Sequence, residues 1–65
     1  MENLLEGLQS EIDRCIELKA MYDEIPEGRF ASIMISREIE LAKKALVGDD
    51  LVDQIRCLKK LQACN

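Results

Sequence analysis

The sequence predicts a small all-α fold: one domain over residues 1–65, built from three helices, whose copies self-associate into a helical bundle. Apolar residues recur at helical spacing in three segments, and Pro26 and Gly48 separate those segments. Of all residues, 48% are hydrophobic but only 3% are aromatic, so the core must be aliphatic, which suits interlocking helices. A chain this short has room for a single core.

The first helix is expected from Leu4 to Tyr22. Pro26 disfavours helical geometry at Ile25 and therefore ends this helix. We expect Met21 to fill the core beside the periodic positions. These positions recur at intervals of three and four, with acidic residues between them: Leu4, Leu5, Leu8, Ile12, Cys15, Ile16 and Tyr22.

The second helix is expected to begin between Pro26 and Arg29 and to reach Leu46. An apolar surface this wide predicts contact on two sides, one within the subunit and one against a partner. Met34, like Met21, is expected as core filler. One apolar face carries Ala31, Ile35, Ala42 and Ala45, and a second stripe carries Phe30, Ile33, Met34 and Leu41.

The third helix follows a second breakpoint, where Gly48 suits the left-handed position after a helix. Asp49 or Asp50 can cap the new helix, an interpretation we prefer to a metal site with Asp53, because the spacing is not that of a calcium loop. Its apolar positions are Leu51, Val52, Ile55, Leu58 and Leu61, and its late cations, where the helix dipole favours them, are Arg56, Lys59 and Lys60.

Domains below about 70–80 residues usually need disulfides, a metal or a partner subunit. Cys15, Cys57 and Cys64 are an odd set without a CxxC pattern, and the absence of histidine argues against a metal site. The start MENLLEGL lacks the features of a signal peptide, and no apolar run reaches the about 20 residues of a membrane span. We therefore expect a cytoplasmic dimer or tetramer with reduced, buried cysteines, no metal, no cofactor and no membrane association.

The net charge of −4 argues against binding duplex nucleic acid, which requires clustered Lys and Arg. An acidic surface serves solubility, or it mimics nucleic acid and blocks a basic groove of another protein. Without histidine, Cys/His and Ser/His catalysis are excluded, and we expect a protein that is not an enzyme.

The segment Tyr22–Phe30 holds the chain's only proline, tyrosine and phenylalanine. Free amides among Gly28, Arg29, Phe30 and Ala31, the helix dipole and the Arg29 guanidinium predict an anion site at the start of the second helix. The predicted ligand-binding residues are Tyr22, Pro26, Gly28, Arg29, Phe30, Ser32 and Arg37, in which Tyr22 and Phe30 stack a base, Ser32 adds a hydroxyl and Arg37 reaches a second phosphate.

A second interpretation makes this segment a turn alone, in which Tyr22 and Phe30 close the end of the core. Glu24 and Glu27 favour that interpretation, since carboxylates repel an anion.

The pattern Tyr22-x-x-Ile25-Pro26-x-Gly28-x-Phe30 resembles a family of very short, uncharacterised helical proteins of phages and prophages. The resemblance covers nearly the whole chain and continues through Met34-Ile35, Ile39-x-x-Ala42-x-x-Ala45-Leu46 and Gly48-Asp49, although Ala31-Ser32 departs from the Gly-Ala of that family.

In size and helical character the chain also resembles phage sponge proteins, which oligomerise and sequester the cyclic nucleotides of bacterial CBASS-type defence. This second resemblance implies a non-enzymatic counter-defence protein of the host bacterial cytoplasm that captures a cyclic di- or trinucleotide at the turn. The alternative is a small acidic protein-binding inhibitor or adaptor, for example a blocker of a host nuclease or CRISPR complex.

Overall fold

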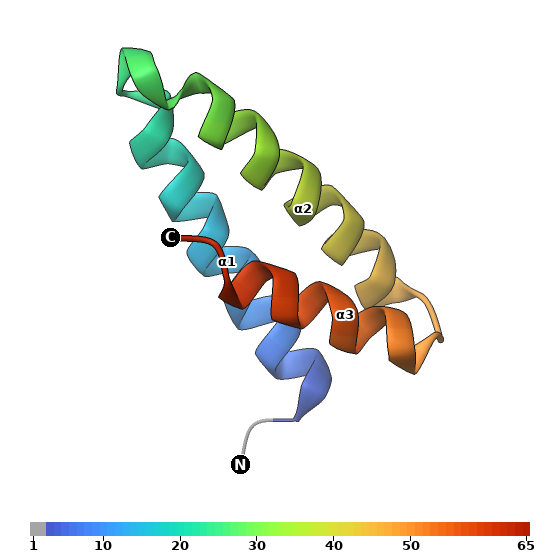
Figure 1. The fold of residues 1–65 in the computed structure, drawn as a ribbon. Helices are drawn as coiled ribbons and strands as arrows, with labels where there is room; N and C mark the ends of the chain where they lie inside the picture. Colours follow the sequence, from blue (N-terminus) through green and yellow to red (C-terminus); the bar gives the residue numbers. More distant parts are fainter. Residues whose placement is uncertain (1–2) are drawn as a thin grey trace.

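The computed structural model describes residues 3–65, which form three α-helices and one short 3₁₀ helix, with no strand in this range (Figure 1). The all-α, three-helix fold predicted from the sequence is confirmed. α1 and α2 form an antiparallel hairpin, and α3 packs against both. The elements are α1 (Leu4–Asp23), η1 (Pro26–Gly28), α2 (Arg29–Val47) and α3 (Leu51–Gln62).

The turn between α1 and α2 follows the local rules for proline. Ile25 has extended backbone geometry, with φ −107° and ψ 124°, because Pro26 disfavours a helical residue before it. Pro26 then opens η1, and α2 starts directly afterwards at Arg29. The prediction that the second helix begins between Pro26 and Arg29 is confirmed.

The connection between α2 and α3 is built differently from the prediction. Gly48 has φ −86° and ψ −179°, an extended conformation, so the predicted left-handed position is wrong. The end of α2 is satisfied instead by the buried side chain of Gln54, whose Nε2 donates to the carbonyls of Ala45 at 3.0 Å and Gly48 at 3.1 Å. Asp50 caps α3 as predicted, since its Oδ1 accepts the Asp53 amide at 3.2 Å.

The core lies between the three helices and is aliphatic. The predicted inner face of α2 is confirmed at Ile35, Ala42 and Ala45. On α3 the predicted face is wrong in part: Leu61 is buried, but Leu51, Val52 and Ile55 are exposed, and Gln54 and Cys57 are buried in their place. The buried apolar side chains are Leu8, Ile12, Cys15, Ile35, Ile39, Ala42, Ala45, Cys57 and Leu61.

α3 is too short to cover the whole hairpin. It has 12 residues, whereas α1 has 20 and α2 has 19. In Figure 1, α3 lies across the half of the hairpin that contains the start of α1, and the turn at η1 extends beyond it. The molecule is therefore elongated, with extents of 37 × 21 × 17 Å, and the turn end of the hairpin has no third helix over it.

Replacing Gly28 with alanine should destabilise the fold by about 1–3 kcal/mol, because a Cβ at this position would overlap the carbonyl oxygen of Tyr22. Gly48→Ala is the matched control. A Cβ at Gly48 would lie 3.4 Å from the nearest atom, an ordinary contact, and its extended backbone accepts alanine. Urea unfolding curves of the three proteins measure the difference. Equal midpoints for Gly28→Ala and wild type would contradict the close packing of this turn.

Candidate functional site

Gly28, at the centre of the predicted site, is buried against the backbone of α1. A Cβ on Gly28 would lie 3.1 Å from the carbonyl carbon of Tyr22 and closer still to its oxygen. The Gly28 amide donates to the Ile25 carbonyl at 2.9 Å. The expectation that this amide is free for an anion is therefore wrong, because the tight turn uses it.

Ser32 and Asp23 tie the first turn of α2 to the end of α1. Ser32 is buried, and its hydroxyl donates to the Asp23 carboxylate. Lys19 donates to the other oxygen of Asp23 at 2.8 Å. The hydrogen bond from Lys19, followed by that from Ser32, lowers the pKa of Asp23 below its usual range. A carboxylate of the chain itself thus lies beside the first turn of α2, where the helix dipole favours an anion.

Tyr22 is also engaged within the chain. Its hydroxyl donates to the carbonyl oxygen of Asn65 at 2.5 Å, and its partly buried ring packs against the core. The ring therefore helps to close the core, as the turn-only interpretation predicted for it. Phe30 does not do so, because its side chain is 77% exposed.

The remaining predicted site residues, Pro26, Arg29 and Arg37, are exposed. Among residues 3–65 the structure gives neither Arg29 nor Arg37 an ion pair. The two arginines are eight positions apart in α2, which corresponds to about 12 Å along the helix axis. Binding of a nucleotide by the seven predicted residues remains a prediction. Of these residues, Arg29, Phe30 and Arg37 have exposed side chains that could contact a ligand.

Five exposed apolar side chains lie on the turn and on the helical turns on either side of it. Met21 is 63% exposed and Met34 is 42% exposed, so their predicted role as core filler is wrong. Met21 lies in the last turn of α1, and Met34 lies in the second turn of α2, where it borders a groove shared with Lys60 of α3. We call this cluster the tip surface; it consists of Met21, Ile25, Phe30, Ile33 and Met34.

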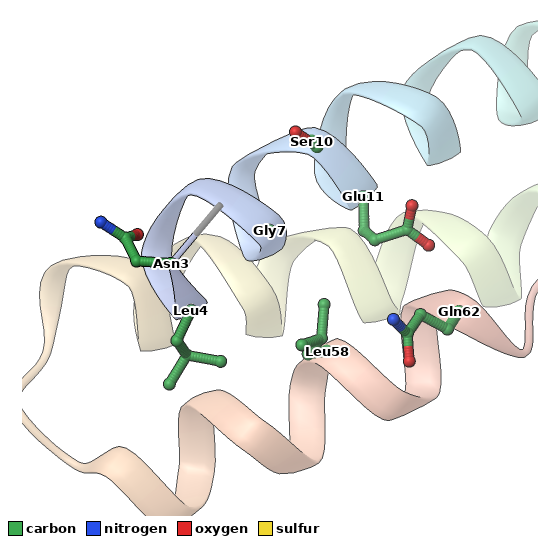
Figure 2. Close-up of a pocket in the computed structure, with 7 residues that line it drawn as sticks. All are labelled: Asn3, Leu4, Gly7, Ser10, Glu11, Leu58 and Gln62. Atoms are coloured by element: carbon green, nitrogen blue, oxygen red, sulfur yellow. The ribbon is translucent and has the colours of Figure 1, made fainter. Parts of the chain in front are cut away.

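Two shallow grooves flank α3. The larger, of about 360 Å³, lies between the first half of α1 and α3. In Figure 2, Leu4 and Leu58 point into it from the two helices, and Glu11 and Gln62 lie at one end. The second groove joins the tip surface to the end of α3 and is lined by Met34, Ile35, Glu38, Lys60, Ala63 and Cys64.

Arg14 holds the end of α3 against α1, a role that the sequence did not indicate. Its Nη2 donates to the carbonyl of Leu61 at 2.6 Å, and its Nε lies 3.2 Å from both carboxylate oxygens of Glu11. The hydrogen bond with Glu11 is the main cause that raises the pKa of Arg14. Cys15 Sγ donates to the same carbonyl of Leu61 at 3.6 Å. The arrangement caps α3 and gives Glu11 a partner.

All three cysteines are free thiols. Cys15 and Cys57 are buried, as predicted, and burial raises the pKa of each thiol. Cys64 is only half-buried, so its predicted burial is wrong. Within the part of the chain that the structure describes, no three His, Cys, Asp or Glu side chains are placed to hold a metal ion.

Over the same residues, no helix combines the length and the apolar character needed to cross a membrane. No protein-family model, curated protein or solved structure matches the chain.

Acid should weaken the fold through Asp23. The pKa of Asp23 is lower in the folded state than in the unfolded state. The stability that Asp23 contributes is therefore fully present above the unfolded-state pKa of about 3.9, and it is lost as the pH falls through the lower folded-state pKa. Wild type should therefore lose more stability than Asp23→Asn between about pH 5 and pH 2. Chemical denaturation at stepped pH measures this, with Asp13→Asn as the exposed control. Parallel pH profiles for wild type and Asp23→Asn would show that Asp23 makes no such contribution.

A thiol reagent should label Cys64 first under native conditions, since Cys15 and Cys57 react only when the core opens. Mass spectrometry of the peptides at successive times assigns each adduct. Equal rates at all three cysteines would contradict the burial of Cys15 and Cys57, and addition of urea should make the three rates converge.

Proposed function

We propose that this protein acts by binding rather than by catalysis, as a small self-associating interaction module of the inhibitor or adaptor class, and that a second copy of the chain covers its tip surface. The tip surface carries this proposal. Phe30 is the most exposed of its side chains, at 77%, and it lies beside the apolar side chains of Ile33 and Met34 on the next turn of α2.

The balance of apolar residues supports a partner. Among residues 3–65, nine apolar side chains form the core, while twelve large apolar side chains are exposed. A single core in a domain of this size rarely supplies more than about 3–5 kcal/mol, so burial of exposed apolar surface against another copy adds substantially to stability.

The polar groups of the turn support contact with protein over capture of a nucleotide. The Gly28 amide and the hydroxyls of Ser32 and Tyr22 are already bonded within the chain. The turn presents outward the apolar side chains of Ile25 and Phe30, and the exposed charges beside them are mainly negative, with Glu24 and Glu27 against Arg29. Aromatic and methionine side chains are typical of the centre of protein interfaces, and charged residues are typical of the rim.

Sedimentation velocity across the micromolar range tests the proposal. Wild type should sediment as an assembly larger than one 7.4 kDa chain. Phe30→Glu should weaken association about tenfold or more, since burying a phenylalanine contributes about 1.5–3 kcal/mol and 1.4 kcal/mol is a factor of ten. Its melting temperature in the monomeric state should be unchanged, because Phe30 is exposed in the single chain.

Ala20→Glu is the matched control, because it adds the same charge at an exposed position of α1 without removing a large apolar side chain. It should assemble as wild type does. A wild type that remains a single chain at every concentration would overturn the proposal.

A further inference from the structure

α3 presents a second apolar surface, on the side turned away from the core. Val52 is 63% exposed and Ile55 is 40% exposed, while Arg56 and Lys59 are exposed beside them. Positions 52, 55, 56 and 59 follow the spacing of one helix face, opposite the buried Gln54, Cys57 and Leu61. We call Val52, Ile55, Arg56 and Lys59 the α3 outer face.

The two surfaces carry opposite charge. Residues 21–30 around the turn hold three carboxylates, those of Asp23, Glu24 and Glu27, against the single cation of Arg29. Residues 52–60, which contain the α3 outer face, hold three cations, those of Arg56, Lys59 and Lys60, against the single carboxylate of Asp53. Within residues 3–65, the structure places none of these α3 cations, and neither Glu24 nor Glu27, in an ion pair. Each surface is therefore an apolar patch with unpaired charges at its edge, and the signs are complementary.

The two surfaces also lie apart on the elongated molecule. In Figure 1 the turn at η1 is at one end of the hairpin, and α3 begins at the opposite end, next to the close of α2. The longest extent of the molecule is 37 Å. One copy is therefore unable to bring its own turn onto the start of its own α3, but it can engage two neighbours at once.

We infer that the tip surface of one copy docks on the α3 outer face of the next, so that copies assemble head to tail. This rests on the proposed self-association through the tip surface and names the surface that receives it. Pairing of two tip surfaces would instead bring together two surfaces with the same excess of negative charge, and like charges across an interface are unfavourable. A head-to-tail contact uses two different patches, so it produces a ring if the rotation closes and an open chain if it does not.

Two variants that each block one surface test the inference. Phe30→Glu removes the centre of the tip surface, and Val52→Glu places a carboxylate in the α3 outer face; both residues are exposed in the single chain, so both variants should fold. Each variant alone should be mainly monomeric at concentrations where wild type assembles. An equimolar mixture should form a 1:1 dimer and nothing larger, because it contains one intact tip surface and one intact α3 outer face. Sedimentation velocity with one variant fluorescently labelled measures the dimer.

The possible results separate this inference from the proposed function. In one outcome, wild type and Val52→Glu assemble alike, only Phe30→Glu dissociates, and the mixture gives no new dimer. Tip surfaces then pair with each other, which overturns the head-to-tail inference and leaves the proposed function standing. A monomeric wild type overturns both. Circular dichroism melting checks the folding of each variant.

Charge reversal gives a second, independent measurement. Glu24→Lys with Glu27→Lys should weaken assembly, as should Arg56→Glu with Lys59→Glu, and all four changes in one chain should restore it, because the complementary signs return. Assembly of wild type should weaken as salt rises, since salt screens exposed charges. Failure of the fourfold variant to recover, with all variants folded, would also count against the head-to-tail contact.

Discussion

The close approach of Gly28 to the backbone of Tyr22 determines how α2 is rotated against α1. No side chain fits between the two segments, so the first turn of α2 must start directly on the end of α1. The bond from Ser32 to Asp23 then fixes the rotation of that turn about its own axis. Since residues on a helix repeat every 3.6 positions, this contact turns Ile35, Ile39 and Ala42 inward along the whole length of α2 and leaves Phe30, Ile33 and Met34 outside.

The position of α3 follows from two side chains that satisfy helix ends. The side chain of Gln54 is buried and donates to two carbonyls at the end of α2. Arg14 donates to the Leu61 carbonyl at the end of α3. Among the described residues no buried side-chain nitrogen or oxygen lacks a hydrogen-bond partner. These bonds place α3 over one half of the hairpin, and its length of 12 residues does not allow it to reach the turn.

The sequence predicted the three helices and their limits because those depend on local signals: the apolar period, Pro26, and the capping residue Asp50. The sequence predicted less well which side chains of each helix face the core. On α2, apolar side chains occupy more than one face, so periodicity alone could not show that the side chain of Met34 is exposed. On α3, periodicity favoured burial of Val52 and Ile55 over Gln54, because the burial of Gln54 depends on a carbonyl of another helix. Around the turn, composition identified Tyr22 and Gly28, and position in the second helix identified Ser32. Their hydrogen bonds to Asn65, Ile25 and Asp23 depend on the folded chain.

The same contacts that make the turn well defined also decide what it can offer to a partner. Gly28, Ser32 and Tyr22 use their polar groups in hydrogen bonds within the chain. The apolar side chains of Ile25 and Phe30 are left exposed, with the charges of Glu24, Glu27 and Arg29 beside them. An apolar centre with an acidic edge is poorly suited to a phosphate and well suited to an apolar patch with a basic edge. The outward side of α3 has that composition at Val52, Ile55, Arg56 and Lys59, and the proposed association would bury apolar side chains that the single chain leaves exposed.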